Sequence, residues 1–218
     1  MTRTITVPAG TSLNYLYDQR QENVIDGICV INFHLERDST LHCFMAITDD
    51  AVSAITLNVF LDGERAQATV RGVYALRDAH KVTITTLQHH RAAHTTSDLI
   101  FKGALSGHAQ AFYHGTIYVD QQAKKTRSLQ KNHTLLLSKT AKSVSVPSLE
   151  VLTHDVHCTH GTAAGYLDAQ TLFYAQSRGL DMEQARRMVL EGFFAQMLEG
   201  LSTSVVVDIY KRIATIGL

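Results

Sequence analysis

ITLNVFLDGERAQATVRGVYALRDAHKVTITTL, residues 55–87, is the stretch that decides the fold. Three short runs within it, 55–61, 68–76 and 81–87, are rich in β-branched and aromatic residues. That composition suits a pleated, half-buried surface, so each run is predicted to be a β-strand. Asp62–Gly63, between the first two runs, is the only strong hairpin signal in the chain.

The pattern of short runs rich in β-branched and aromatic residues continues to about residue 160. Further short strands are predicted at 115–120, 133–138 and 147–152, and no segment here has a clear helical periodicity. Short strands at regular spacing are typical of a β-sandwich, a β-barrel or a β-solenoid. Many strands with few hairpin turns favour the solenoid, in which each strand stacks on a strand of an earlier coil. No exact repeat period is visible.

The last quarter of the chain changes to helical patterns. Asp168 can cap a helix over 169–178, which Gly179 ends. Asp181 and Gln184 are spaced as in a capping box and predict a second helix. The predicted apolar stripe of that helix consists of Ala185, Met188, Val189, Gly192, Phe193 and Met197.

A third helix is expected over 203–217. Phe193, Phe194, Met197 and Leu198 are apolar and must pack on the β-rich part or on a partner. The predicted organisation is a β-rich core domain over 1–166 and a helical domain over 167–218.

Composition narrows the class of protein. Lys plus Arg equals Asp plus Glu at 20 each, and the basic stretch 124–131 has no interleaved aromatic residues, so no nucleic-acid partner is expected. No apolar run is long enough to span a membrane, and no signal peptide is expected at the start. The three cysteines indicate a reducing compartment, so we expect the cytoplasm.

The stretch THDVHCTHG (153–161) is the part of the sequence richest in side chains that can bind a metal. Cys158 and His160 are two residues apart, so on a strand they share a face; His154 has the same parity and His157 faces away. Sulfur and imidazole together suit iron, zinc or copper. The stretch HHRAAH, residues 89–94, is a possible second half of such a site. Inert histidines, metal ligands and a catalytic pair all remain open.

Other motifs are absent or less informative. Cys29 and Cys43 lie in apolar strands and are interpreted as small buried hydrophobes. The residues His94 to Asp98 are interpreted as a polar coil whose side chains are hydrogen-bonded within the stack. No Walker-type phosphate loop occurs, so the chain is not expected to bind a nucleotide through such a loop.

Residues 89–194 contain HTTSD, KGAL, NHTLLLS, P-x-LEV, DVHCTHG, LFYAQSRG and EQARRMVLEGF in this order. This ordered set resembles the SufB/SufD family of iron–sulfur cluster assembly proteins. Within that family, a cysteine followed after one residue by His-Gly resembles the SufD type, and here these residues are Cys158, His160 and Gly161.

The resemblance implies a right-handed parallel β-helix followed by a small helical domain. It implies a scaffold subunit rather than an enzyme, with iron or a nascent cluster held transiently by Cys158 and His160, and with His133 and His154 as weaker candidates. It also implies pairing with a SufB-like or identical subunit, and a SufC-like ABC ATPase docked on the C-terminal helices. The residues expected at the ATPase contact are Leu172, Phe173, Arg178, Arg186, Phe193 and Phe194.

The sequence departs from the family pattern in two ways. Asn132 and Gly161 stand where SufB-type members carry a cysteine and a glutamate, and residues 1–88 match only in strand texture, without the family's N-terminal region. Two alternatives therefore stay open. One is an interaction subunit without metal chemistry, and the other is a stand-alone zinc or iron protein that uses His154, Cys158 and His160.

Overall fold

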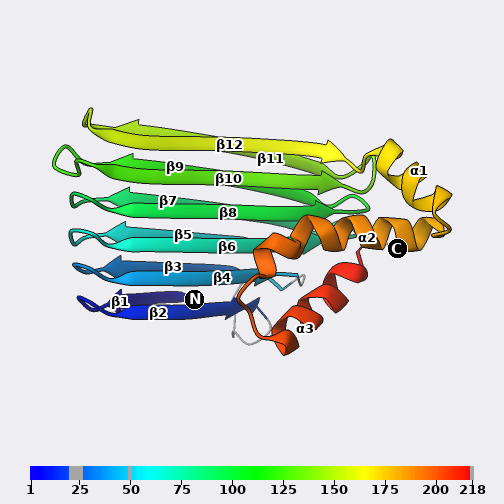
Figure 1. Cartoon of the computed structure of the whole chain (residues 1–218), viewed down its shortest axis with the longest axis horizontal. Coiled ribbons are helices and arrows are strands. Elements are labelled where there is room, and N and C mark those ends of the chain that lie inside the picture. Colours follow the sequence, from blue (N-terminus) through cyan, green and yellow to red (C-terminus); the bar gives the residue numbers. More distant parts are fainter. Residues whose placement is uncertain (20–26, 49–50, 217–218) are drawn as a thin grey trace.

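The computed structural model describes residues 1–19, 27–48 and 51–216 and contains two parallel six-stranded sheets. Consecutive strands alternate between the sheets, and each strand pairs with the strand two positions away (Figure 1). Sheet A consists of β1 (Thr2–Val7), β3 (Ile28–Leu35), β5 (Ala54–Leu61), β7 (Lys81–His90), β9 (Gln110–Val119) and β11 (Lys142–Val151). Sheet B consists of β2 (Ser12–Asp18), β4 (Thr40–Ile47), β6 (Gln67–Leu76), β8 (Thr96–Leu105), β10 (Thr126–Leu136) and β12 (Val156–Tyr166).

This arrangement is a β-helix in which one odd and one even strand form each coil. The predicted parallel β-helix with C-terminal helices is therefore confirmed. Coil length varies: Ile28 pairs with Ala54, whereas Gln110 pairs with Lys142. The unequal spacing explains why no exact repeat is visible in the sequence.

The corners that link the sheets at one end also stack. A residue with positive φ occupies each of five successive corners, and its backbone N–H donates to a carbonyl oxygen in the next corner. These residues are Gly10, Asp38, Arg65, His94 and Lys125. Asp62–Gly63 lies in one such corner and not in a hairpin, since β5 and β6 belong to different sheets. A side chain at Gly63 would clash with the backbone of Arg37.

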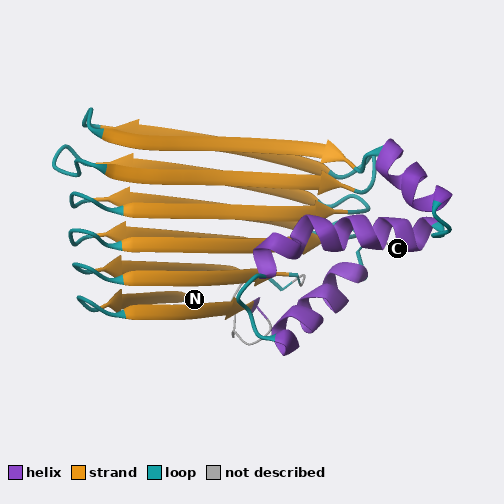
Figure 2. Ribbon diagram, viewed as in Figure 1, coloured by secondary structure: helices purple, strands orange, loops and turns teal. Residues whose placement is uncertain are grey.

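Of the C-terminal helices, the second and third pack on the outer face of sheet B, and the first lies beyond the strand ends (Figure 2). They are α1 (Ala169–Ser177), α2 (Met182–Ala195), a 3-10 turn (Gln196–Leu198) and α3 (Thr203–Ala214). Asp168 caps α1, and Asp181 with Gln184 forms a capping box on α2, as predicted. Residue 217, the end of the predicted third helix, lies outside the described residues. Among the described helices, none combines the length and apolar character needed to cross a bilayer.

The buried stripe of α2 differs from the predicted one. Ala185 is buried as expected, but Leu190 and Phe194 are the other buried residues, and Met188 is 46% exposed. Phe194 packs with Phe44 and Val73 on the outer face of sheet B. Met197 is also buried as predicted, and Val189 and Phe193 are half-buried, so the prediction was wrong only for Met188 and Gly192, which are exposed. The reason is that sheet B contacts a side of the helix that is rotated from the one that spacing alone selects.

Arg212 ties the last helix to the first coil. Its guanidinium donates to both carboxylate oxygens of Asp18, at 3.1 and 2.9 Å, and to the hydroxyl of Thr48 at 3.0 Å. Asp208 is its second carboxylate partner. Because Arg212 and Asp18 are 12% and 7% exposed, this pair fixes α3 on sheet B.

The interior changes from apolar to polar along the β-helix. The inward residues of β5 are apolar, namely Ile55, Leu57, Val59 and Leu61. Before Leu136, the last residue of β10, the inward residues of that strand are all polar, namely Thr126, Ser128, Gln130, Asn132 and Thr134. The coils near the C-terminal end of the β-helix therefore depend on internal hydrogen bonds where the earlier coils depend on apolar burial.

Two glycines make the middle of this interior possible. Gly72 pairs in register with Phe101, and Tyr74 pairs with Gly103, so each aromatic ring lies over the glycine of the neighbouring strand. A Cβ atom at either glycine would clash with the opposing ring. Tyr74 is held in this place by hydrogen bonds from its hydroxyl to Asn132, at 3.1 Å, and with Thr134, at 2.6 Å.

Substitution of Gly103 by alanine tests this packing. The new methyl group forces the ring of Tyr74 out of place, so Gly103→Ala should lower the free energy of unfolding by about 1–3 kcal/mol. Gly165→Ala is the matched control, because a Cβ atom there meets nothing within 4 Å. Urea unfolding of both variants checks the prediction, and equal stabilities would contradict it.

Candidate functional site

Cys158 and His160 lie on β12, the last strand of sheet B. In register, Cys158 pairs with Ser128 and His160 pairs with Gln130. Ser128 and Gln130 are buried in the interior, so Cys158 and His160 point the same way. Among the described strands, β12 pairs only with β10, which leaves the inner face of the last coil open at one end of the β-helix (Figure 1).

The two side chains have different surroundings. His160 is exposed, whereas the free thiol of Cys158 is half-buried beside Ile117 and Val119. Burial raises the pKa of the Cys158 thiol, and a hydrogen bond with the backbone of Ser128 opposes this rise. The thiol is therefore protonated at neutral pH, and a metal that binds it has to displace the proton.

The structure separates His154 from this pair. β12 begins at Val156, so His154 lies in the preceding corner and not on the strand face that its parity indicates. It lines a surface hollow together with His157, Lys125 and Arg127. His157 faces away from Cys158, as predicted.

His133 is also placed away from the pair. It lies on β10, but its neighbours Asn132 and Thr134 point inward, so His133 is on the outer face of sheet B. Burial, with Lys102 and Lys131 close by, lowers the pKa of its imidazole. His133 therefore does not share the inward face of Cys158 and His160, and its role as a weaker ligand candidate stays a prediction.

The upstream histidines do not complete the site either. His89 lies on the outer face of sheet A, where it bonds to Asp120 at 3.1 Å. His90 is buried, its two ring nitrogens bond to Thr95 and Ser97, and burial lowers its pKa to about 3. Within the described ranges, no group of three or more histidine, cysteine or acidic side chains is arranged to hold a metal ion. In this structure His154, Cys158 and His160 are therefore not arranged as one stand-alone metal site.

The expected hydrogen-bonded polar coil is present. Ser97 bonds to the hydroxyl of Ser128 at 2.8 Å, and Thr95 bonds to that of Thr126 at 3.1 Å. Asp98 lies on the outer face, paired with Arg71 at 3.0 Å. Cys29 and Cys43 are buried, 1% and 3% exposed, as their apolar strands predict.

Asn132, at the position of the SufB-type cysteine, is an interior residue. It accepts a hydrogen bond from Tyr74 and donates one to Ser145 at 3.3 Å. Sequence reasoning missed this polar interior, because Leu129 and Leu135 of β10 point outward. The available signal was the unbroken run of polar residues at every second position from Thr126 to Thr134.

The helical residues expected at a partner contact fall into two groups. Phe173 and Tyr174 on α1 are 73% and 59% exposed, and the guanidinium of Arg178 lies 5.1 Å from the centre of the Tyr174 ring. Arg186 is exposed and Leu172 is half-buried. Phe194 is 0% exposed and packs within the chain, while Phe193 is half-buried against it, so Phe194 cannot serve as a partner contact in this structure.

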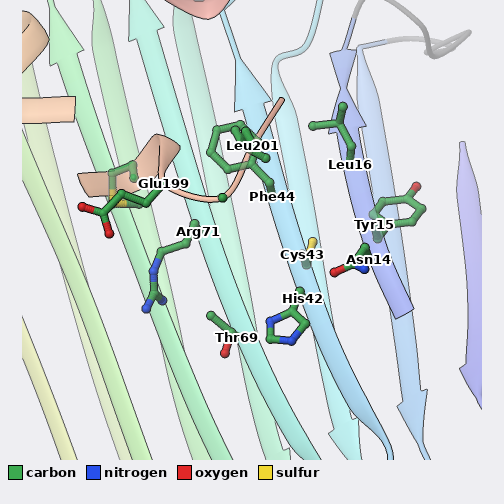
Figure 3. A pocket seen from close by; sticks show the side chains of 12 residues that line it. Asn14, Tyr15, Leu16, His42, Cys43, Phe44, Thr69, Arg71, Glu199 and Leu201 are labelled. Atoms are coloured by element: carbon green, nitrogen blue, oxygen red, sulfur yellow. The ribbon is translucent and has the colours of Figure 1, made fainter. Parts of the chain in front are cut away.

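A separate groove lies between the outer face of sheet B and residues 197–201 (Figure 3). Its volume is about 360 Å³, within the range of small-molecule pockets. Leu16, Phe44 and Leu201 form its apolar part, and Asn14 and His42 lie at its polar end. Neither Cys158 nor His160 lines it, and sequence reasoning assigned it no role.

Comparison with known proteins agrees with the fold and the motifs. Residues 2–193 match the family model described as SUF system FeS cluster assembly, SufBD core domain. The chain is 30% identical over 186 residues to the iron–sulfur cluster assembly protein SufD of Escherichia coli, covering 82% of this chain and 44% of that protein. It is 29% identical over 180 residues to an iron–sulfur cluster assembly SufBD family protein of Mycobacterium leprae, covering 79% of this chain and 46% of that protein.

The chloroplastic protein ABCI7 of Arabidopsis thaliana is 37% identical over 90 residues, which cover 41% of this chain and 19% of that protein. The chain thus spans somewhat less than half the length of the bacterial relatives compared here. Since the family model covers most of the chain, the protein belongs to the SufBD family of iron–sulfur cluster assembly proteins.

Proposed function

We propose that the chain is a SufD-like scaffold subunit in iron–sulfur cluster assembly. In this proposal Cys158 and His160 offer a sulfur and a nitrogen ligand to iron or to a nascent cluster, which is cargo and is held transiently. The supporting observation is that both side chains lie on the open inner face of the last coil. The relative of E. coli that is named SufD adds support through its 30% identity.

The pair needs further ligands from elsewhere. Two donors do not fill the four positions that tetrahedral iron or zinc sites prefer. A second subunit, either SufB-like or identical, supplies the remaining ligands when it packs on the last coil. The apolar rim of that coil favours such packing, because Leu149, Leu152 and Tyr166 are 39%, 55% and 58% exposed.

The same proposal places a SufC-like ABC ATPase on the C-terminal helical region, 167–218. Phe173 and Tyr174 on α1 form an exposed aromatic patch with Arg178, and aromatic and arginine side chains dominate the binding energy at interfaces. The chain itself acts without its own turnover, and it binds no nucleotide. Because the chain has only three cysteines, an odd and low number that argues against a disulfide framework, the reducing cytoplasm is the proposed compartment.

A second candidate function is an interaction subunit without metal chemistry. It is favoured by Asn132, which is committed to hydrogen bonds with Tyr74 and Ser145 at the position of the SufB-type cysteine. In this version the last coil and α1 only hold the complex together. Recruitment of the ATPase without retention of iron distinguishes it from the first candidate.

Removal of either proposed ligand tests the scaffold function. Cys158→Ala and His160→Ala should each reduce the iron and acid-labile sulfide of the anaerobically reconstituted complex to background, because each removes a donor atom. Reconstitution uses the ATPase, the partner subunit and a sulfur donor. His157→Ala is the matched control, since this neighbouring side chain faces away from the pair. Unchanged cluster content in both ligand variants would disprove the ligand assignment.

Truncation of the aromatic patch tests the ATPase contact. Phe173→Ala should weaken binding of the ATPase about 30-fold, the loss expected for an interface hot spot of about 2 kcal/mol. The melting temperature of the Phe173→Ala chain should not change, because the Phe173 side chain is 73% exposed. Val144→Ala, on the outer face of sheet A and 45% exposed, is the control for surface truncation. Titration calorimetry measures both, and equal affinities would place the contact elsewhere.

A further inference from the structure

A pair of amide side chains crosses the interior of the β-helix. Gln88 on β7 belongs to sheet A, Gln130 on β10 belongs to sheet B, and both are 1% exposed. Nε2 of Gln88 donates to Oε1 of Gln130 at 3.4 Å. This distance is longer than the usual range for an N–H···O bond, so the two amides are only loosely joined.

The other two amide atoms lack partners. Among the described residues, Oε1 of Gln88 and Nε2 of Gln130 are buried and make no hydrogen bond. Exchange of oxygen and nitrogen in both amides leaves the same count, one donor and one acceptor unpaired. Buried polar side chains in folded proteins are nearly always paired, with protein or with ordered water.

The hydroxyl groups near the two glutamines do not pair with the two unpaired amide atoms. The hydroxyl of Tyr113 is bonded to Thr86 at 2.9 Å, and that of Tyr74 is bonded to Thr134. Gly115 provides the room for the amide of Gln130, since a Cβ atom there would clash with it. The site is therefore polar and buried, and it lies beside a position that has no side chain.

We propose that Gln88 and Gln130 bind one ordered water molecule inside the β-helix. The water accepts a hydrogen bond from Nε2 of Gln130 and donates one to Oε1 of Gln88, which satisfies both atoms. Buried waters of this kind occupy polar sites and bridge groups that lack protein partners. The water links sheet A to sheet B one coil below His160, because Gln130 pairs in register with His160. This site does not depend on any role of His160 in iron binding.

Water–protein nuclear Overhauser spectroscopy of the folded chain tests the proposal. The side-chain NH₂ protons of Gln130 should show a cross-peak to water with the sign of a long-lived contact. The exposed Gln67 is the control within the same spectrum, because its contact with bulk water gives the opposite sign. Absence of the Gln130 cross-peak would overturn the proposal.

Gln88→Met separates bound water from exchange through nearby hydroxyls. This change removes the acceptor but keeps the length of the side chain, so the Gln130 cross-peak should disappear. A cross-peak of unchanged intensity would assign the signal to the hydroxyl of Thr86 or Tyr113 and overturn the proposal. If the variant does not fold, a high-resolution crystal structure of the unchanged chain decides. Density for a water between the two amides supports the site, and a directly paired amide couple without such density refutes it.

Discussion

The structure depends on one constraint, the parallel pairing of each strand with the strand two positions away. This pairing aligns residues of successive coils in columns that share one environment. The column that contains Ser97 and Ser128 ends at Cys158 on the last coil. Because the described part of the chain has no strand beyond β12, the inward residues of β12 are half-buried or exposed, although those beneath them on β10 are mostly buried. In the proposed function, the coil that ends the stack is therefore the surface on which a second subunit packs.

The change from an apolar to a polar interior gives the two ends of the β-helix different properties. Early coils are held by aliphatic side chains and by aromatic rings that lie over glycines, as Phe101 does over Gly72. Later coils are held by hydrogen bonds such as the one between Ser143 and Thr134, at 3.1 Å. A polar interior loses less free energy than an apolar one when water reaches it, since its groups can exchange partners with water. This is consistent with an open last coil that gains a covering only in a complex.

Strand composition and capping boxes are local signals, so the sequence predicted the strands and the helix caps. Strand spacing favoured a solenoid over a sandwich or barrel, and the parallel β-helix itself was implied by the resemblance to the SufB/SufD family. Sequence-based predictions were wrong where the position of a residue depends on which strands and helices contact each other. Asp62–Gly63 has the local chemistry of a hairpin, but stacking on the corner beneath makes it a link between sheets. The outward direction of His133 and the burial of Phe194 depend on sheet B and on the helix that covers it. That Cys158 and His160 share a strand face was predicted, since the two-residue spacing along one strand is itself a local property, whereas their role as ligands stays a prediction.

The central claim is that the inner face of the last coil is open in the isolated chain. Alkylation of the native protein at alkaline pH, followed by mass spectrometry, tests this claim directly through the three cysteines of the chain. Cys158 should be modified while Cys29 and Cys43, which are 1% and 3% exposed, remain unmodified until the chain unfolds. Equal resistance of all three thiols in the native chain would show that the last coil is closed and would contradict the account.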